Sequence, residues 1–202
     1  MSLLLNVFVA ASQLNEGYFQ YDIELQAMDD TPQTKQTISM FRNSKMEMFF
    51  VPNKTRINFI MGQFSTTSII VDRKKKMTLS LSDSYFGKKA ILTNAIDDSE
   101  GQNQSVKIHN DRRVILGYNC YRAEVTSSDG VTSEYWLTDS IKIDKESQKI
   151  LNHNLPGFPV QFSKIDDGVK MTFQLTNMKK TVDNSDEVFS VEVPAGYELI
   201  KQ

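Results

Sequence analysis

Alternation of apolar and polar residues is the feature of this sequence that most constrains its fold. From Tyr18 to Leu25, the apolar side chains of Phe19, Tyr21 and Ile23 alternate with glutamine and acidic residues. A period of two residues is that of a β-strand with one face buried and the other solvated. The sequence therefore predicts a half-buried strand over residues 18–25.

The same pattern recurs along the chain, and turn residues separate the repeats. Further strands are predicted around 38–42, 46–50, 56–61, 67–71, 77–81, 114–125, 131–137, 159–165, 170–175 and 188–193. Turns are predicted at Pro52-Asn53, at the charged run 72–76, at Asp129-Gly130 and at Asp167-Gly168, because such residues favour tight hairpin connections. Many short strands joined by hairpins indicate a mainly β, antiparallel fold.

Other conformations are predicted in only a few places. Residues 94–104 are polar and are expected to form a loop that divides the sheet. Residues 140–151 could form a helix or an extended surface segment. We expect no helix longer than about three turns.

Size and composition limit the class of protein. The chain has 202 residues, 40% of them hydrophobic, which is enough to bury a core without disulfides or metals. The 23 basic and 25 acidic side chains give a net charge of -2, so no nucleic-acid partner is expected. The single cysteine, Cys120, excludes an intramolecular disulfide and multi-cysteine zinc sites.

The N-terminal segment is set apart from the rest, so we divide the chain into an apolar segment, 1–16, and a single β domain, 17–202. Val9 and Ala11 stand like the residues before a signal-peptidase site, although the positively charged start of a signal is missing. The segment is either the remnant of an export signal or an apolar piece docked on the domain, and in the second case we expect it on the concave side of the sheet. The chain has no apolar run near the length of a membrane-spanning helix, so it is not expected to be an integral membrane protein.

Candidate chemistry is sparse. Cys120 could act as a nucleophile with His109, but a free cysteine inside a strand more often serves as a small buried hydrophobe, and we favour that interpretation. His109 and His153 are too few for a multi-histidine metal site. We therefore predict no catalytic residue, metal or cofactor.

Methionines and phenylalanines on predicted strand faces are the strongest lead to function. Methionine is flexible and adapts to varied apolar partners. The side chains that we predict to contact an apolar ligand are Met40, Met48, Phe50, Phe59, Met61, Met77, Met171 and Phe173. Plain filling of the core is the alternative for the same residues.

Several short pieces, in their order along the chain, resemble a known family. They are FFVPNKTR (49–56), IIVDRKKKM (69–77), ILGYNCYRA (115–123), EYWLTD (134–139), LPGFP (155–159) and VPAGY (193–197). In these pieces the chain resembles the outer-membrane lipoprotein-carrier superfamily of LolA, LolB and related lipoprotein-sorting proteins. Within that superfamily it looks most like small uncharacterised secreted domains of Gram-negative bacteria.

The resemblance implies a strongly curved antiparallel sheet, an incomplete barrel with few short helices or loops that plug its concave face. It also implies export, a periplasmic or outer-membrane location, and binding of a lipid or a lipoprotein acyl chain. Together with the methionine-rich faces, it predicts a non-enzymatic domain of the cell envelope that binds an apolar ligand. The alternatives are a structural or protein-interaction module with a solid core and an envelope protein as its partner, and an enzyme built on Cys120 and His109.

Overall fold

The computed structural model describes residues 12–94, 104–149, 151, 155–166 and 168–200. The strands are β1 (Ser12–Leu14), β2 (Gly17–Ala27), β3 (Lys45–Val51), β4 (Lys54–Met61), β5 (Ser65–Asp72), β6 (Met77–Ser84), β7 (Gly87–Thr93), β8 (Ser105–Ile115), β9 (Tyr118–Thr126), β10 (Thr132–Thr138), β11 (Ile141–Ile143), β12 (Phe158–Asp166), β13 (Val169–Lys179) and β14 (Glu198–Ile200). The helices are α1 (Pro32–Met40), α2 (Lys145–Lys149) and α3 (Ser185–Val188).

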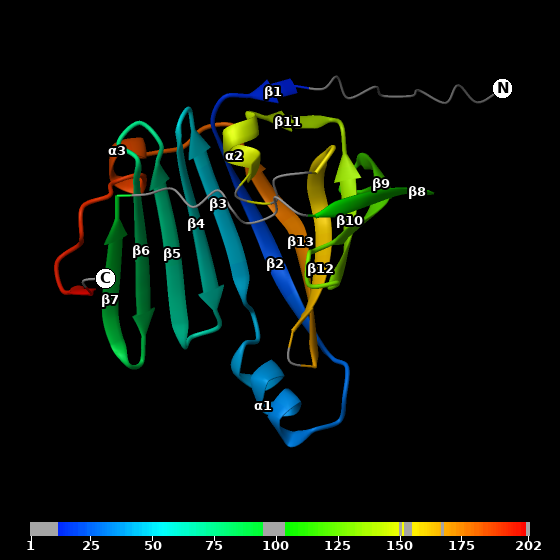
Figure 1. The fold of residues 1–202 in the computed structure, drawn as a ribbon, viewed down its shortest axis with the longest axis horizontal. Coiled ribbons are helices and arrows are strands. Elements are labelled where there is room, and N and C mark those ends of the chain that lie inside the picture. Colours follow the sequence, from blue (N-terminus) through cyan, green and yellow to red (C-terminus); the bar gives the residue numbers. More distant parts are fainter. Residues whose placement is uncertain (1–11, 95–103, 150, 152–154, 167, 201–202) are drawn as a thin grey trace.

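One 12-stranded sheet dominates the architecture, which confirms the predicted mainly β class. Its strand order is β14-β7-β6-β5-β4-β3-β2-β13-β12-β10-β9-β8, and all its pairs are antiparallel except β14 with β7. The sheet is open, with β14 and β8 as its two edges. Figure 1 shows β7 to β2 side by side and nearly face-on, whereas β12 and β10 stand closer to edge-on, so the sheet turns along its width. A separate two-stranded ladder joins β1 to β11 in parallel.

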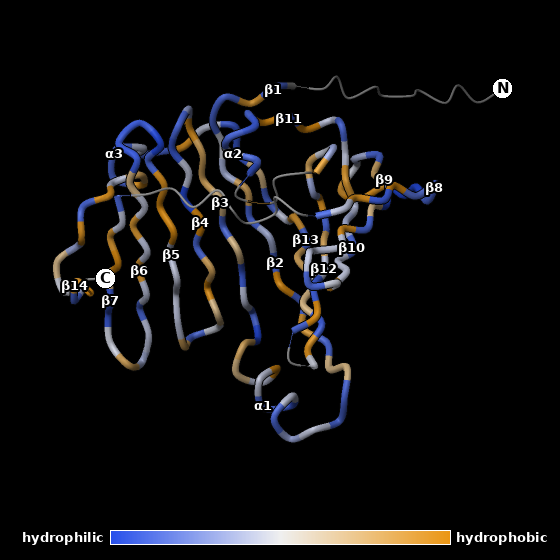
Figure 2. The backbone as a smooth tube through the Cα atoms, in the orientation of Figure 1, coloured by the Kyte–Doolittle hydropathy of each residue, from blue (hydrophilic) through white to orange (hydrophobic). Residues whose placement is uncertain are grey.

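Alternation along the strands gives the sheet two distinct faces, and Figure 2 shows the corresponding change of hydropathy along neighbouring strands. We call the side that carries Phe19 the core face. The register aligns Phe19 with Met48 and Met48 with Ile57, so all three side chains lie on this face. The opposite side, which the C-terminal segment covers over β5 to β7, is called the strap face.

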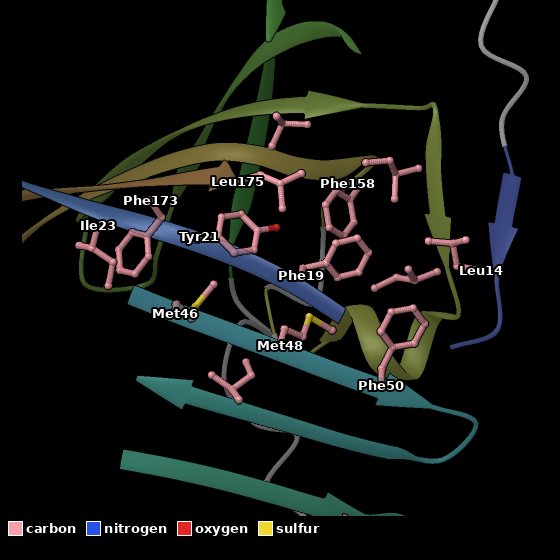
Figure 3. Close-up of a cluster of buried hydrophobic side chains, with 14 of the residues drawn as sticks. Leu14, Phe19, Tyr21, Ile23, Met46, Met48, Phe50, Phe158, Phe173 and Leu175 are labelled. Carbon is pink, nitrogen blue, oxygen red and sulfur yellow. The ribbon is translucent and has the colours of Figure 1, made fainter. Parts of the chain in front are cut away.

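The main core lies on the core face at the centre of the sheet (Figure 3). The ring of Phe19 is fully buried, with its centroid 5.6 Å from that of Phe50 and 4.6 Å from that of Phe158. The hydroxyl of Tyr21 donates to the Pro159 carbonyl oxygen at 2.8 Å, which satisfies its polar atom inside the core. β1 adds Leu14 to the same cluster, so the ladder with β11 closes one end of it.

A second core forms on the strap face. Ile70, Leu79 and Leu81 are buried there against Val191 of the C-terminal segment. Since β5 to β7 bury this face while β2 to β4 bury the other, the apolar side of the sheet changes midway across its width.

Three details of the predicted strands are wrong. Residues 38–42 belong to α1 and the turn after it: Thr31 caps the helix by accepting from the Thr34 N–H, and Pro32 occupies its first turn, where the missing proline N–H costs nothing. Residues 188–193 are not a strand but the end of α3 and the extended cover of the second core. The predicted strand 114–125 is interrupted at Leu116-Gly117, where both residues have positive φ and connect β8 to β9.

Other predictions are confirmed or lie outside the described residues. The turns at 52–53, 72–76 and 129–130 connect consecutive strands as expected. Residues 140–151 contain both β11 and α2, so each of the two alternatives holds for part of the segment. The expectations for residues 3–11, for most of the loop 94–104, for Asp167 and for His153 fall outside the described residues.

Replacing Phe19 tests the central packing. We expect Phe19→Ala to lower the free energy of unfolding by about 3–5 kcal/mol, because the buried ring leaves a cavity between its neighbours. Urea denaturation followed by circular dichroism measures the change. Glu24→Ala, at an exposed position of the same strand, should stay within about 0.5 kcal/mol of the parent, and equal losses in both variants would contradict the assignment.

Candidate functional site

The eight side chains predicted to contact an apolar ligand do not form one site. Met48, Phe50 and Phe173 are buried in the main core, and Phe59 and Met171 are half-buried against it. The side chain of Met61 lies on the same face, since it is two residues beyond Phe59 on β4.

Two of the eight were placed wrongly by the sequence analysis. Met40 is the last residue of α1 and not part of a strand face. Met77 pairs with Asp72 at the start of β6 and packs against the second core, so it lies on the strap face.

The core face changes character beyond β4. One row of paired residues across β4 to β7 consists of Ile57, Ile69, Ser80 and Ile91. The neighbouring row on the same face consists of Phe59, Thr67 and Ser82. We call Thr67, Ile69, Ser80, Ser82 and Ile91 the hydroxyl-lined patch. All five are half-buried, and among the described residues none belongs to either the main or the second apolar core. The patch therefore combines small hydroxyl side chains with flanking isoleucines, in contrast to the large side chains of the main core.

A polar network, which the sequence analysis missed, crosses the strap face of β3 to β5. Arg56 Nε donates to Asn58 Oδ1 at 2.8 Å, and Arg56 Nη1 donates to the Val188 carbonyl oxygen at 3.2 Å. Asn58 Nδ2 in turn donates to Glu47 Oε2 at 3.0 Å. Burial lowers the pKa of Arg56. Because the guanidinium bonds to the carbonyl at the end of α3, this network attaches the C-terminal segment to the sheet.

A second charged cluster joins β8, β9 and β10 around Arg122. Its guanidinium lies 2.8 Å from Asp111 Oδ2 through Nε and 2.8 Å from Glu124 Oε1 through Nη1. Arg122 Nη2 is 3.0 Å from His109 Nδ1, and since a guanidinium can only donate, Nδ1 must accept. The ring proton therefore sits on Nε2, which lies 3.0 Å from Glu124 Oε2. This cluster ties the edge strand β8 to the sheet.

Cys120 has the surroundings of a structural residue. Its side chain is buried in the main core, and Sγ contacts the Tyr118 carbonyl oxygen at 3.4 Å. Burial raises the pKa of the thiol, which lowers the thiolate fraction that a nucleophile needs. His109, its suggested partner, is instead engaged by Arg122 and Glu124.

The part of the chain that the structure describes carries neither a candidate metal cluster nor a helix that could span a membrane. No three or more His, Cys, Asp or Glu side chains there are grouped so that they could hold a metal ion. Within the same residues, no helix combines the length and the apolar character needed to cross a membrane.

Comparisons with known proteins give a fold likeness. No protein-family model matches the chain, and no curated protein matches it. An uncharacterized conserved protein from Thermus thermophilus superposes with a TM-score of 0.52 at 10% sequence identity, over 94% of this chain and 92% of that one. PNGF-II superposes with a TM-score of 0.47 at 16% sequence identity over 93% of this chain. This chain matches only 31% of the length of PNGF-II. The likeness to the Thermus protein shows a shared fold, and the relation to the lipoprotein carriers stays a prediction.

The Arg122 cluster predicts sensitivity to acid. The hydrogen bond from Arg122 lowers the pKa of Asp111 below its ordinary 3.8, and contact with His109, followed by the bond from Arg122, lowers that of Glu124 below 4.5. A carboxylate with a lowered pKa in the folded state stabilises the fold above its unfolded pKa, and this contribution disappears as the pH falls through the folded-state value. Stability should therefore fall as the pH drops below about 5. Arg122→Met should flatten this dependence in urea titrations, and an unchanged slope would contradict the role of the cluster. Lys142→Met, at the exposed position of β11, is the control.

The burial of Cys120 predicts a protected thiol. In the native protein we expect reaction with Ellman's reagent to be slow, because the sulfur is both buried and protonated. In guanidinium chloride the same thiol should react at the rate of an unfolded cysteine. Rapid labelling of the native protein at neutral pH would instead support a reactive cysteine.

Proposed function

We propose that this chain is a non-enzymatic binding domain of the cell envelope that shelters an apolar ligand, a lipid or a lipoprotein acyl chain, on the core face of its sheet. The observation that carries the proposal is the hydroxyl-lined patch beside Phe59 and Met61. There an apolar surface continues from the main core onto strands whose side chains are small.

The position of this patch modifies the ligand site expected from the sequence. Met48, Phe50 and Phe173 are packed by neighbouring side chains, so a ligand at the centre would have to displace a filled core. At close-packed density such displacement is costly. Phe59 and Met61, at the border of the packed region, are therefore the side chains of the original set that would contact the ligand, with Ile69 and Ile91 as further contacts.

The incomplete barrel is part of the same proposal. The turn of the sheet along its width in Figure 1 supports a curved surface that an acyl chain could follow. Such a ligand needs apolar and adaptable side chains and no catalytic group. A periplasmic or outer-membrane location agrees with this ligand class, and fractionation of the producing cells would test it.

A protein-interaction module with a solid core is the second candidate. The filled centre of the sheet favours it, as does the strong exposure of Tyr85 and Phe86 at the β6–β7 turn. Aromatic side chains are enriched at interfaces. If this candidate is correct, the protein should carry no lipid when it is purified.

Filling the patch tests the ligand proposal. The protein would be purified without detergent and extracted with organic solvent, and the extract would be quantified by mass spectrometry. We expect the parent to retain lipid and Ser80→Phe to retain at least about tenfold less, a loss of about 1.4 kcal/mol in binding, because the new ring occupies the space above β6.

Thr172→Phe is the matched control, since Thr172 is also half-buried on a strand but lies on the opposite face of the sheet. This variant should retain as much lipid as the parent. Absence of lipid from the parent, together with no binding of a fluorescent fatty acid, would overturn the proposal in favour of the solid-core module.

A further inference from the structure

The helix α1 and the turns β4–β5 and β6–β7 lie at the same end of the sheet (Figure 1). Two adjoining hollows at this end form a groove. One part, of about 370 Å³, lies between the end of α1 and the β4–β5 turn. The other, of about 450 Å³, lies between the β4–β5 and β6–β7 turns. Both parts are lined by Gly62, Gln63 and Phe64, so the β4–β5 turn lies between them. None of these residues belongs to the hydroxyl-lined patch.

The β4–β5 turn is held in place by a close backbone contact. Gly62 has a φ of +56°, and a Cβ atom there would lie 2.7 Å from the Met40 carbonyl oxygen. Only glycine permits both this conformation and this approach. The turn therefore sits tightly against the end of α1, which fixes the shape of the groove before any ligand binds.

Aromatic rings stand along the groove and contact other rings. Phe64 is 46% exposed, and its centroid lies 6.4 Å from that of Phe41 in an edge-to-face contact. Tyr85 is 92% exposed and makes an edge-to-face contact with Phe86 at 6.0 Å. Phe64 thus keeps a large area available to a ligand while it packs on Phe41, and Tyr85 and Phe86, which is 89% exposed, present almost their whole rings.

The polar groups between the rings are mostly uncharged. Gln63, Ser65 and Thr66 supply amide and hydroxyl groups that can both donate and accept. The carboxylate in this part of the groove, that of Asp83, is 2.7 Å from Lys88 Nζ and is thereby neutralised. Arg42, just beyond the end of α1, adds a cationic side chain to the other part of the groove, beside Asn43 and Gln63. Most of the groove consequently offers aromatic surface beside neutral hydrogen-bonding groups.

We propose that this groove binds a neutral oligosaccharide. A sugar ring has one face of C–H groups, which can stack on an aromatic ring, and a rim of hydroxyls, which pair with amides and hydroxyls. Phe64 and Tyr85 are the stacking platforms, and Gln63 and Thr66 bind the sugar hydroxyls.

Other occupants fit less well. An acyl chain would bury the amide and hydroxyl groups of the groove without partners, at a cost of about 1–3 kcal/mol for each group. An anionic ligand would meet the Asp83 carboxylate, and of the groove's lining side chains it would find a positive charge on Arg42 alone. The rings of Phe64, Tyr85 and Phe86 supply at most about 150–250 Å² each, together less than the roughly 800 Å² that each partner contributes to a stable protein interface.

A glycan array followed by calorimetry tests the proposal. The full chain would be screened on immobilised neutral and acidic glycans and then titrated with the neutral hexaoses of cellulose, starch, chitin and mannan. We expect binding to at least one neutral oligosaccharide, and a loss of about tenfold or more in affinity for Tyr85→Ala and for Phe64→Ala, because each variant removes a stacking platform.

Leu116→Ala serves as the matched control, because Leu116 is also exposed, at the β8–β9 turn, and contributes nothing to the groove. Thermal unfolding verifies that all three variants are folded. The Tyr85→Ala variant is the decisive one, because a side chain that is almost fully exposed can be removed without disturbing the fold. Failure of the parent to bind any glycan would overturn the proposal, as would undiminished binding by Tyr85→Ala. The proposal would also be overturned if the protein bound vesicles of phosphatidylglycerol and no glycans, and if this binding required Tyr85. In that case the aromatic β6–β7 turn would bind a lipid surface.

Discussion

The fold depends on the packing of Phe19 at the centre of the sheet. Its ring lies between those of Phe50 on β3 and Phe158 on β12, and so connects the N-terminal hairpins with the C-terminal strands. β2 itself pairs with β3 on one side and β13 on the other, which makes it the strand through which the two halves of the chain become one sheet. Apolar burial at this position is worth several kcal/mol, a large fraction of the stability of a typical domain.

From this centre, the sheet buries opposite faces on its two sides. The strands β2 to β4 cover the main core, whereas β5 to β7 turn their apolar residues toward Val191 and the C-terminal segment. Arg56, half-buried on the strap face, bonds to the Val188 carbonyl oxygen and fixes the start of that cover. On the core face of β5 to β7, small hydroxyl residues alternate with isoleucines, and this is the patch at which we propose that a ligand binds.

The sequence predicted most strands of the fold because alternation is a local property. β2, β3, β4 and β6 were found from their own residues, and so were the turns at 52–53 and 72–76. The strand prediction was wrong for residues 38–42, where apolar residues at alternate positions gave the pattern of a strand. There the signals that decided the structure were the Thr31 cap and Pro32 in the first turn of α1, which favour a helix whatever the later pattern.

The sequence by itself determined that this chain forms hairpin-rich antiparallel sheet with a soft apolar core, since strand periodicity and turn residues act over a few neighbours. Only the tertiary structure decided which face each strand buries. Met77 and Met61 look alike in sequence, yet they lie on opposite faces, because register and the course of the C-terminal segment depend on contacts between distant residues. The same distant contacts bring Phe64 and Tyr85 to one groove, and no local pattern could have joined them.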